Sequence, residues 1–242
     1  MRHLLLILSG LLLTTCFDPA GSTDSLSEGI IDYRITYFDS PESNPIISTL
    51  PNTLQLCFKK NNTKITLNGY LNFFGFSYLT MYKPRESYTI LRIVDKNYVN
   101  QSEFGKQAYG YEDLSRYIVK YTERTKQILG YTCKEVIYIE PENKERRIHI
   151  YYTDEINIKN PNINNPFKKV DGVLLEFEVV LNGIKMRFEA TNICGKQVAD
   201  NEFVLPKKYS LVEDAELDHI IRGFLPPIEE NKRQRVHPPR HK

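Results

Sequence analysis

The sequence lacks an excess of either charge. Its 242 residues include 32 Lys+Arg and 30 Asp+Glu, so the formal net charge is 32 − 30 = +2. Proteins that bind nucleic acid mainly by electrostatics carry a strongly basic surface, so this balance argues against nucleic acid as a partner. Hydrophobic residues make up 41% of the chain. This share is enough for a packed core and excludes a disordered protein.

Strong catalytic and metal-binding motifs are also missing. The sequence contains no G-x-S-x-G turn, phosphate-binding glycine loop, H-E-x-x-H helix or closely spaced Cys pair. His149 could act as an acid or base, although a histidine on a strand surface is the simpler interpretation. His237 and His241 have no carboxylate or thiolate neighbours and make a poor metal site. We therefore predict a protein that is not an enzyme and needs no cofactor or metal.

The apolar run at the N-terminus, residues 4–13, is too short to span a membrane. As a helix it rises about 15 Å, half of the roughly 30 Å of bilayer hydrocarbon. It follows two basic residues and therefore predicts an export signal over residues 1–15. The letters LTTC that end at Cys16 resemble a bacterial lipobox, apart from Thr15, where Gly, Ala or Ser is usual. We predict a lipidated Cys16 that anchors the chain to a membrane; the alternative is an ordinary secretory signal beside an incidental Cys.

Composition then divides the rest of the chain into three parts. Residues 16–28 are the lipidated Cys and a polar, flexible tether. Residues 29–225 are a single antiparallel β domain. Residues 226–242 are rich in proline and basic residues and predict a disordered tail, which is either simply solvated or in contact with anionic lipid headgroups.

The body of the chain alternates apolar and polar residues with period two, which predicts strands. Asn182-Gly183 is the strongest hairpin signal, and the strands that flank it have one apolar and one charged face. The segment Leu71–Met81 is apolar on both faces, with Phe74, Phe76 and Tyr78 opposite Leu71, Phe73 and Leu79. A second layer or a bound apolar group must therefore cover its aromatic side. The predicted strands are 30–38, 53–59, 64–67, 71–81, 87–94, 118–124, 131–139, 147–153, 173–181 and 184–191.

Helical spacing is rare. Leu217, Ile220, Ile221 and Phe224 recur at helical intervals and predict a helix that lies across the sheet. Residues 112–119 suit a helix or a strand equally well.

The cysteines after Cys16 are odd in number. Cys57, Cys133 and Cys194 leave one thiol over in a compartment where disulfides form. Cys133 and Cys194 are the preferred pair, because both lie beside turn-like glycines. Buried, unpaired thiols are the alternative.

Five stretches of the chain carry a resemblance to a known family. They are EGIIDYRITY, TKQILGYTCKEV, RIHIYYTDEI, KVDGVLLEFEVVLNGIKMRFEATNI and DNEFVLPKKY, and they cover much of residues 28–209. With the lipobox, this order of features resembles lipoproteins of Bacteroidetes with LolA-like or related β domains. It is also similar to GLPGLI-type proteins, although that motif itself is absent. The resemblance implies a mostly β fold, a strongly curved antiparallel half-barrel with one or two helices on its concave side, and no catalytic residues.

Two functions are compatible with these features. The first is a non-catalytic lipoprotein of the bacterial envelope, anchored in the outer membrane and facing the periplasm or the cell surface. It would bind a lipid, an acyl chain or another apolar ligand in the concave face. The alternative is a scaffold lipoprotein with a closed core, which docks an envelope protein and has no ligand. A cavity distinguishes the two. The candidate lining residues are Phe74, Phe76, Phe177, Val179, Met186 and Phe188.

Overall fold

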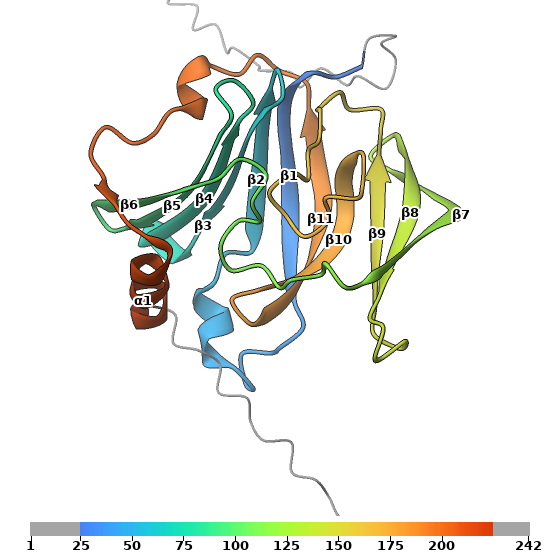
Figure 1. The fold of residues 1–242 in the computed structure, drawn as a ribbon, viewed down its shortest axis with the longest axis horizontal. Coiled ribbons are helices and arrows are strands. Elements are labelled where there is room, and N and C mark those ends of the chain that lie inside the picture. Colours follow the sequence, from blue (N-terminus) through green and yellow to red (C-terminus); the bar gives the residue numbers. More distant parts are fainter. Residues whose placement is uncertain (1–24, 225–242) are drawn as a thin grey trace, which may run out of the picture.

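The computed structural model describes residues 25–224, and all of its strands belong to one curved, unclosed sheet of twelve strands (Figure 1). The strand order is β12-β6-β5-β4-β3-β2-β1-β11-β10-β9-β8-β7. Every neighbouring pair is antiparallel except β12 and β6, which are parallel. The predicted class, a mostly β curved antiparallel sheet, is confirmed. The elements are β1 (Glu28–Tyr37), η2 (Pro45–Thr49), β2 (Thr53–Lys59), β3 (Asn62–Asn68), η3 (Tyr70–Asn72), β4 (Phe74–Met81), β5 (Glu86–Ile93), β6 (Lys96–Ser102), β7 (Ile118–Ile128), β8 (Tyr131–Ile139), β9 (Arg147–Thr153), β10 (Val173–Leu181), β11 (Ile184–Cys194), η4 (Asp200–Phe203), β12 (Ser210–Leu211) and α1 (Asp214–Phe224).

The hairpin of β10 and β11 forms as predicted. Asn182 and Gly183 both have positive φ, 49° and 80°, as the favoured two-residue turn requires. The turn sets Phe177 opposite Phe188 on the inner face of the sheet. On the outer face, Arg187 Nη2 lies 2.6 Å from the Glu178 carboxylate.

Two long loops, rather than helices, cover most of the inner face. Residues 103–117 and 154–172 cross in front of the central strands (Figure 1) and contribute Leu114, Phe167 and Val170 to the main core. Their backbones are joined because the Ala108 amide donates to the Asn164 carbonyl at 2.7 Å. The side-chain amide of Asn162 donates to the carbonyls of Val170 and Gly172, both at 2.8 Å. Residues 112–117 belong to this cover, and the strand β7 begins at Ile118.

Among residues 25–224 the only α-helix is α1, as the spacing predicted. Its apolar residues Leu217 and Ile221 pack against Leu91 of β5. The helix is fixed at its start by Asp214, which lies 3.0 Å from Lys106 Nζ and accepts a hydrogen bond of 3.0 Å from Asn100. A helix therefore covers one part of the inner face and loops cover the rest.

The outer face of β4 and β5 is covered by the segment that contains η4. Phe203 packs there against Leu79 and Tyr88. The predicted cover of the aromatic side lies on the inner face, where Tyr111 of the loop 103–117 stacks on Tyr78. Leu71 and Phe73, which were also expected to be buried, are exposed. The reason is that β4 begins only at Phe74 and the two residues belong to the turn before it.

The predicted disulfide between Cys133 and Cys194 is wrong. Cys133 is a free, buried thiol, as is Cys57. Cys133 lies on β8 and Cys194 on β11, with β9 and β10 between them. Three strand spacings of about 4.8 Å place the two strands about 14 Å apart, twice the Cα separation that a disulfide tolerates.

Three predictions fall outside the described residues. They are the signal at 1–15, the lipidated Cys16 with most of its tether, and the tail at 226–242. Within residues 25–224, no helix combines the length and apolarity needed to cross a bilayer.

Candidate functional site: an apolar pocket at one end of the sheet

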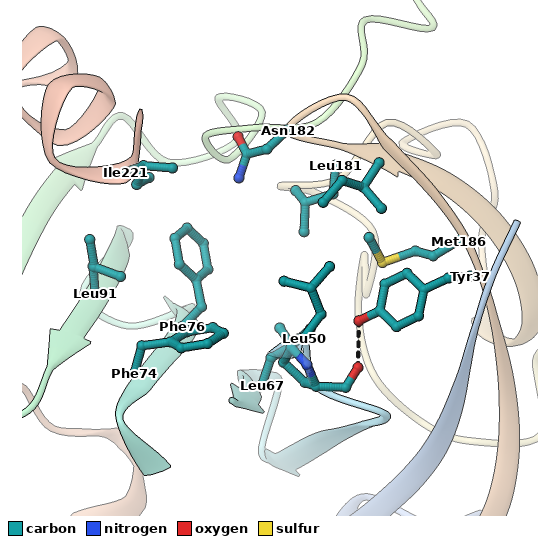
Figure 2. Close-up of a pocket in the computed structure, with 12 residues that line it drawn as sticks. Tyr37, Leu50, Leu67, Phe74, Phe76, Leu91, Leu181, Asn182, Met186 and Ile221 are labelled. Atoms are coloured by element: carbon teal, nitrogen blue, oxygen red, sulfur yellow. Dashed lines mark hydrogen bonds between the residues drawn. The ribbon is translucent and has the colours of Figure 1, made fainter. Parts of the chain in front are cut away.

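A pocket opens where several strands begin or end (Figure 2). Tyr37 is the last residue of β1, Phe74 the first of β4, Leu181 the last of β10 and Ile184 the first of β11. Since neighbouring strands are antiparallel, these positions meet at one end of the sheet. We call this end of the sheet the pocket end and the cavity itself the end pocket. Ile221 of α1 closes one side. The lining consists of Tyr37, Leu50, Pro51, Leu67, Phe74, Phe76, Leu91, Leu181, Asn182, Ile184, Met186 and Ile221.

The lining is almost entirely hydrocarbon. The Asn182 side chain is the one amide among the lining residues. The Tyr37 hydroxyl donates to the Pro51 carbonyl (Figure 2), and burial raises the pKa of this tyrosine. A site with so few free polar groups gives water little to bind and favours an apolar occupant.

The pocket is small. Its volume is about 60 Å³, well below the apolar cavity of about 150 Å³ that is known to bind benzene. It can therefore accept the end of an alkyl chain or one apolar side chain, but not a whole lipid.

A second cavity lies beneath the inner loops and holds about 40 Å³. Its aromatic residues pack tightly, with Phe177 stacked on Phe188 at 5.0 Å between ring centroids. Phe167, from the loop 154–172, meets Phe177 edge-on at 6.0 Å. The Tyr33 hydroxyl donates to the Leu174 carbonyl at 2.8 Å and ties β1 to β10 across this core. The centre of the inner face is filled by the chain itself.

The six lining residues predicted from the sequence are divided between these two spaces. Phe74, Phe76 and Met186 line the end pocket, and Phe177, Val179 and Phe188 line the inner cavity. Sequence reasoning missed Leu50, Leu67 and Ile221, which complete the end pocket. Leu50 comes from a loop and Ile221 from the helix, so alternation along a strand gives no signal for either.

The most elaborate polar site lies at the opposite edge of the sheet, on β7–β9. The Glu135 side chain is fully buried and accepts hydrogen bonds from Thr122 at 2.8 Å and Tyr151 at 3.2 Å. His149 Nδ1 lies 3.0 Å from the same carboxylate. Burial raises the pKa of Glu135, but these hydrogen bonds outweigh burial and lower the pKa below its usual value. The cluster holds the irregular stretch of β7 between Tyr121 and Thr125 against β8.

Among residues 25–224, no three or more His, Cys, Asp or Glu side chains are grouped so that they could hold a metal ion.

Comparison with known proteins supports the fold. No protein-family model and no curated protein matches the chain. The chain is similar to PNGF-II. In its P21 crystal form the TM-score is 0.51 at 16% identity, over 81% of this chain and 33% of PNGF-II. In its C2 form the score is 0.42 at 17% identity, over 76% and 30%.

This protein therefore spans about a third of the length of PNGF-II, and the likeness bears on the fold alone. LprF from Mycobacterium bovis matches over 75% of this chain and 91% of its own, at 12% identity and a TM-score of 0.28, too low to support an argument.

Proposed function

We propose that the protein is a non-catalytic lipoprotein of the bacterial envelope that binds the end of an aliphatic chain in the end pocket. The observation that carries this proposal is that the end pocket is open and is lined almost entirely by hydrocarbon side chains. The lipobox-like Cys16 and the resemblance to LolA-like lipoproteins favour an anchor in the outer membrane and an acyl ligand.

The end pocket is a better ligand site than the concave face as a whole. The loops 103–117 and 154–172 already fill that face, and Phe167 is fully buried there. Opening the inner cavity would expose this core to water, whereas the end pocket needs no such change. We therefore assign ligand binding to Phe74, Phe76 and Met186 and a packing role to Phe177, Val179 and Phe188.

The expected affinity is low. A chain end that buries roughly 150 Å² of apolar surface gains about 4 kcal/mol at 25 cal/mol per Å². Lost translational and rotational freedom offsets much of this gain. A dissociation constant of 1 mM already corresponds to about 4.1 kcal/mol of net binding free energy, so we expect constants of roughly 10 mM or weaker for single-chain probes, which would suit brief contacts rather than storage.

Methionine methyl NMR tests the assignment directly. The chain has three Met residues. Met186 lines the end pocket, and Met81 packs on the outer face of the sheet against the cluster that contains Leu79, Tyr88 and Phe203. Titration of the full chain with decanoate should shift the Met186 methyl resonance saturably. The Met81 resonance should not move and serves as the internal control. Equal movement of both resonances, or movement of neither, would contradict the pocket as a ligand site.

A closed-core scaffold is the second candidate, and the small inner cavity of about 40 Å³ favours it. In this alternative the protein docks an envelope partner and carries no ligand. An unmoved Met186 resonance at saturating decanoate would support it.

A further inference from the structure

We propose that the pocket end docks on an anionic lipid bilayer through an apolar tip formed by Leu71, Phe73 and Val94. These side chains are 72%, 59% and 59% exposed and lie on two joined turns, whereas apolar side chains that are exposed singly are ordinary. The tip lies in the turn between β3 and β4 and the turn between β5 and β6. The inference rests on the proposed function in one respect, because it names the source of the pocket's aliphatic ligand.

The two turns form one continuous surface. The Val94 amide donates to the Phe73 carbonyl at 2.8 Å, so the turns are joined by their backbones. Arg92 Nη1 donates to the Asn72 carbonyl at 2.6 Å and fixes the first turn against β5. Phe73 directly precedes Phe74, which lines the pocket. The apolar tip is therefore rigid and continuous with the rim of the end pocket.

The backbone at the tip would favour a different residue type. Leu71 has φ 49° and Val94 φ 54°, a left-handed conformation that suits Gly or Asn and disfavours branched side chains. A polar Asn would satisfy both the conformation and the solvent. What sets this place apart is that three bulky apolar residues are exposed together on two joined turns, two of them with positive φ, and such a patch indicates a contact that the isolated chain does not make.

Charge favours a lipid surface as the partner. Helix α1 contributes Ile221 to the pocket, and the sequence beyond its last residue, Phe224, begins at this end of the sheet. Residues 229–242 contain five Lys/Arg and two Glu, an excess of 5 − 2 = +3. An apolar surface and a basic segment in the same chain are the combination that binds anionic headgroups and inserts below them. A tip of three protruding side chains is also smaller than the roughly 800 Å² per partner of a stable protein interface.

An anchor at Cys16, as proposed above, permits this orientation. β1 begins at Glu28 and its ten residues end at the pocket, so the chain enters the sheet about 30 Å from the tip. The twelve residues 16–27 can span at most about 40 Å. A chain anchored at Cys16 can therefore place the apolar tip on the same membrane.

A solvent-sensitive fluorophore on an introduced, exposed cysteine tests which end touches lipid, because the native thiols of Cys57 and Cys133 are buried. The full chain, bound to vesicles of phosphatidylcholine with one third phosphatidylglycerol, is labelled at Leu71→Cys or at Leu129→Cys. Leu129 is the matched control: it has φ 51°, is 44% exposed, and lies in the turn between β7 and β8 at the opposite end of the sheet. We expect a blue shift at position 71, smaller with phosphatidylcholine alone, and none at position 129. No shift at position 71, or equal shifts at both positions, would overturn the proposal.

Asparagine variants separate docking from folding. Leu71→Asn and Val94→Asn suit the left-handed backbone, so each should melt at or above the wild-type temperature. Each should nevertheless lower the fraction of vesicle-bound chain whose tip is inserted, by roughly tenfold. Leu129→Asn should leave insertion unchanged. Unchanged insertion in both tip variants would refute the apolar tip, and the Met186 titration, done without vesicles, distinguishes this failure from failure of the pocket.

Discussion

Filling the end pocket should make the protein more stable and abolish ligand binding. Leu50 is half-buried, follows η2 and lines the pocket, so its side chain can turn inward without moving a strand. Leu50→Phe adds three carbon atoms. Cavities cost about 24 cal/mol per Å³, so the 60 Å³ pocket sets an upper limit of about 1.4 kcal/mol on the gain. In a chain of this size, that gain would raise the melting temperature by about 3 to 6 °C.

The opposite substitution provides the control. Leu50→Ala enlarges the pocket and removes part of its wall, which should cost about 1 to 2 kcal/mol for a half-buried leucine while leaving decanoate able to bind. Calorimetry measures both stabilities, and the Met186 methyl titration measures binding. A Leu50→Phe chain that still shows the wild-type Met186 shift, or that loses more than about 1 kcal/mol, would refute the assignment of this pocket.

Three further predictions concern the rest of the chain. Glu135→Gln should flatten the loss of stability below pH 5. The pKa of Glu135 is lower in the folded chain than its unfolded value of about 4.3, so the ionised carboxylate stabilises the fold above that value, and this stabilisation is lost as pH falls through the folded pKa. Melting temperatures of variant and wild type that fall in parallel with pH would contradict this role. Burial raises the pKa of Cys133 to about 12 and also raises that of Cys57, so iodoacetamide at pH 8 should modify them only in denaturant, as mass spectrometry can map. Cys16→Ala should abolish incorporation of labelled fatty acid in cells, and persistent label would show that another residue is acylated.

The sheet could be predicted largely because its strands follow simple alternation. β1 alternates the buried Ile31, Tyr33 and Ile35 with outward-facing Asp32 and Arg34, and period two is enough to find it. β6, with the sequence KNYVNQS, escaped because its pattern is polar. Its Asn100 is buried, and the side-chain amide donates to the Val212 carbonyl at 3.0 Å. A partner 112 residues away satisfies this amide, which no local pattern reveals.

The loops and the cysteines show a second limit of local patterns. The asparagine-rich stretch near residues 160–165 is typical of an exposed turn, yet Asn162 is buried because it caps two carbonyls of its own loop. Cys133 and Cys194 have similar neighbours in the sequence, but their separation depends on the strand order. Both outcomes are set by topology and by distant partners.

Topology also explains why the apolar space remains at one end. The aromatic inner face required a cover, and the chain supplies it through the loop 154–172, which joins the end of β9 to the start of β10. Because β10 runs toward the pocket, both ends of this loop lie at the opposite end of the sheet. The loop therefore fills the inner face from that side, and Phe167 reaches the rings of Phe177 and Tyr138 but not the end pocket. The apolar surface left beyond its reach is lined by Phe74, Phe76 and Met186, so we expect ligand binding there and rigidity in the centre.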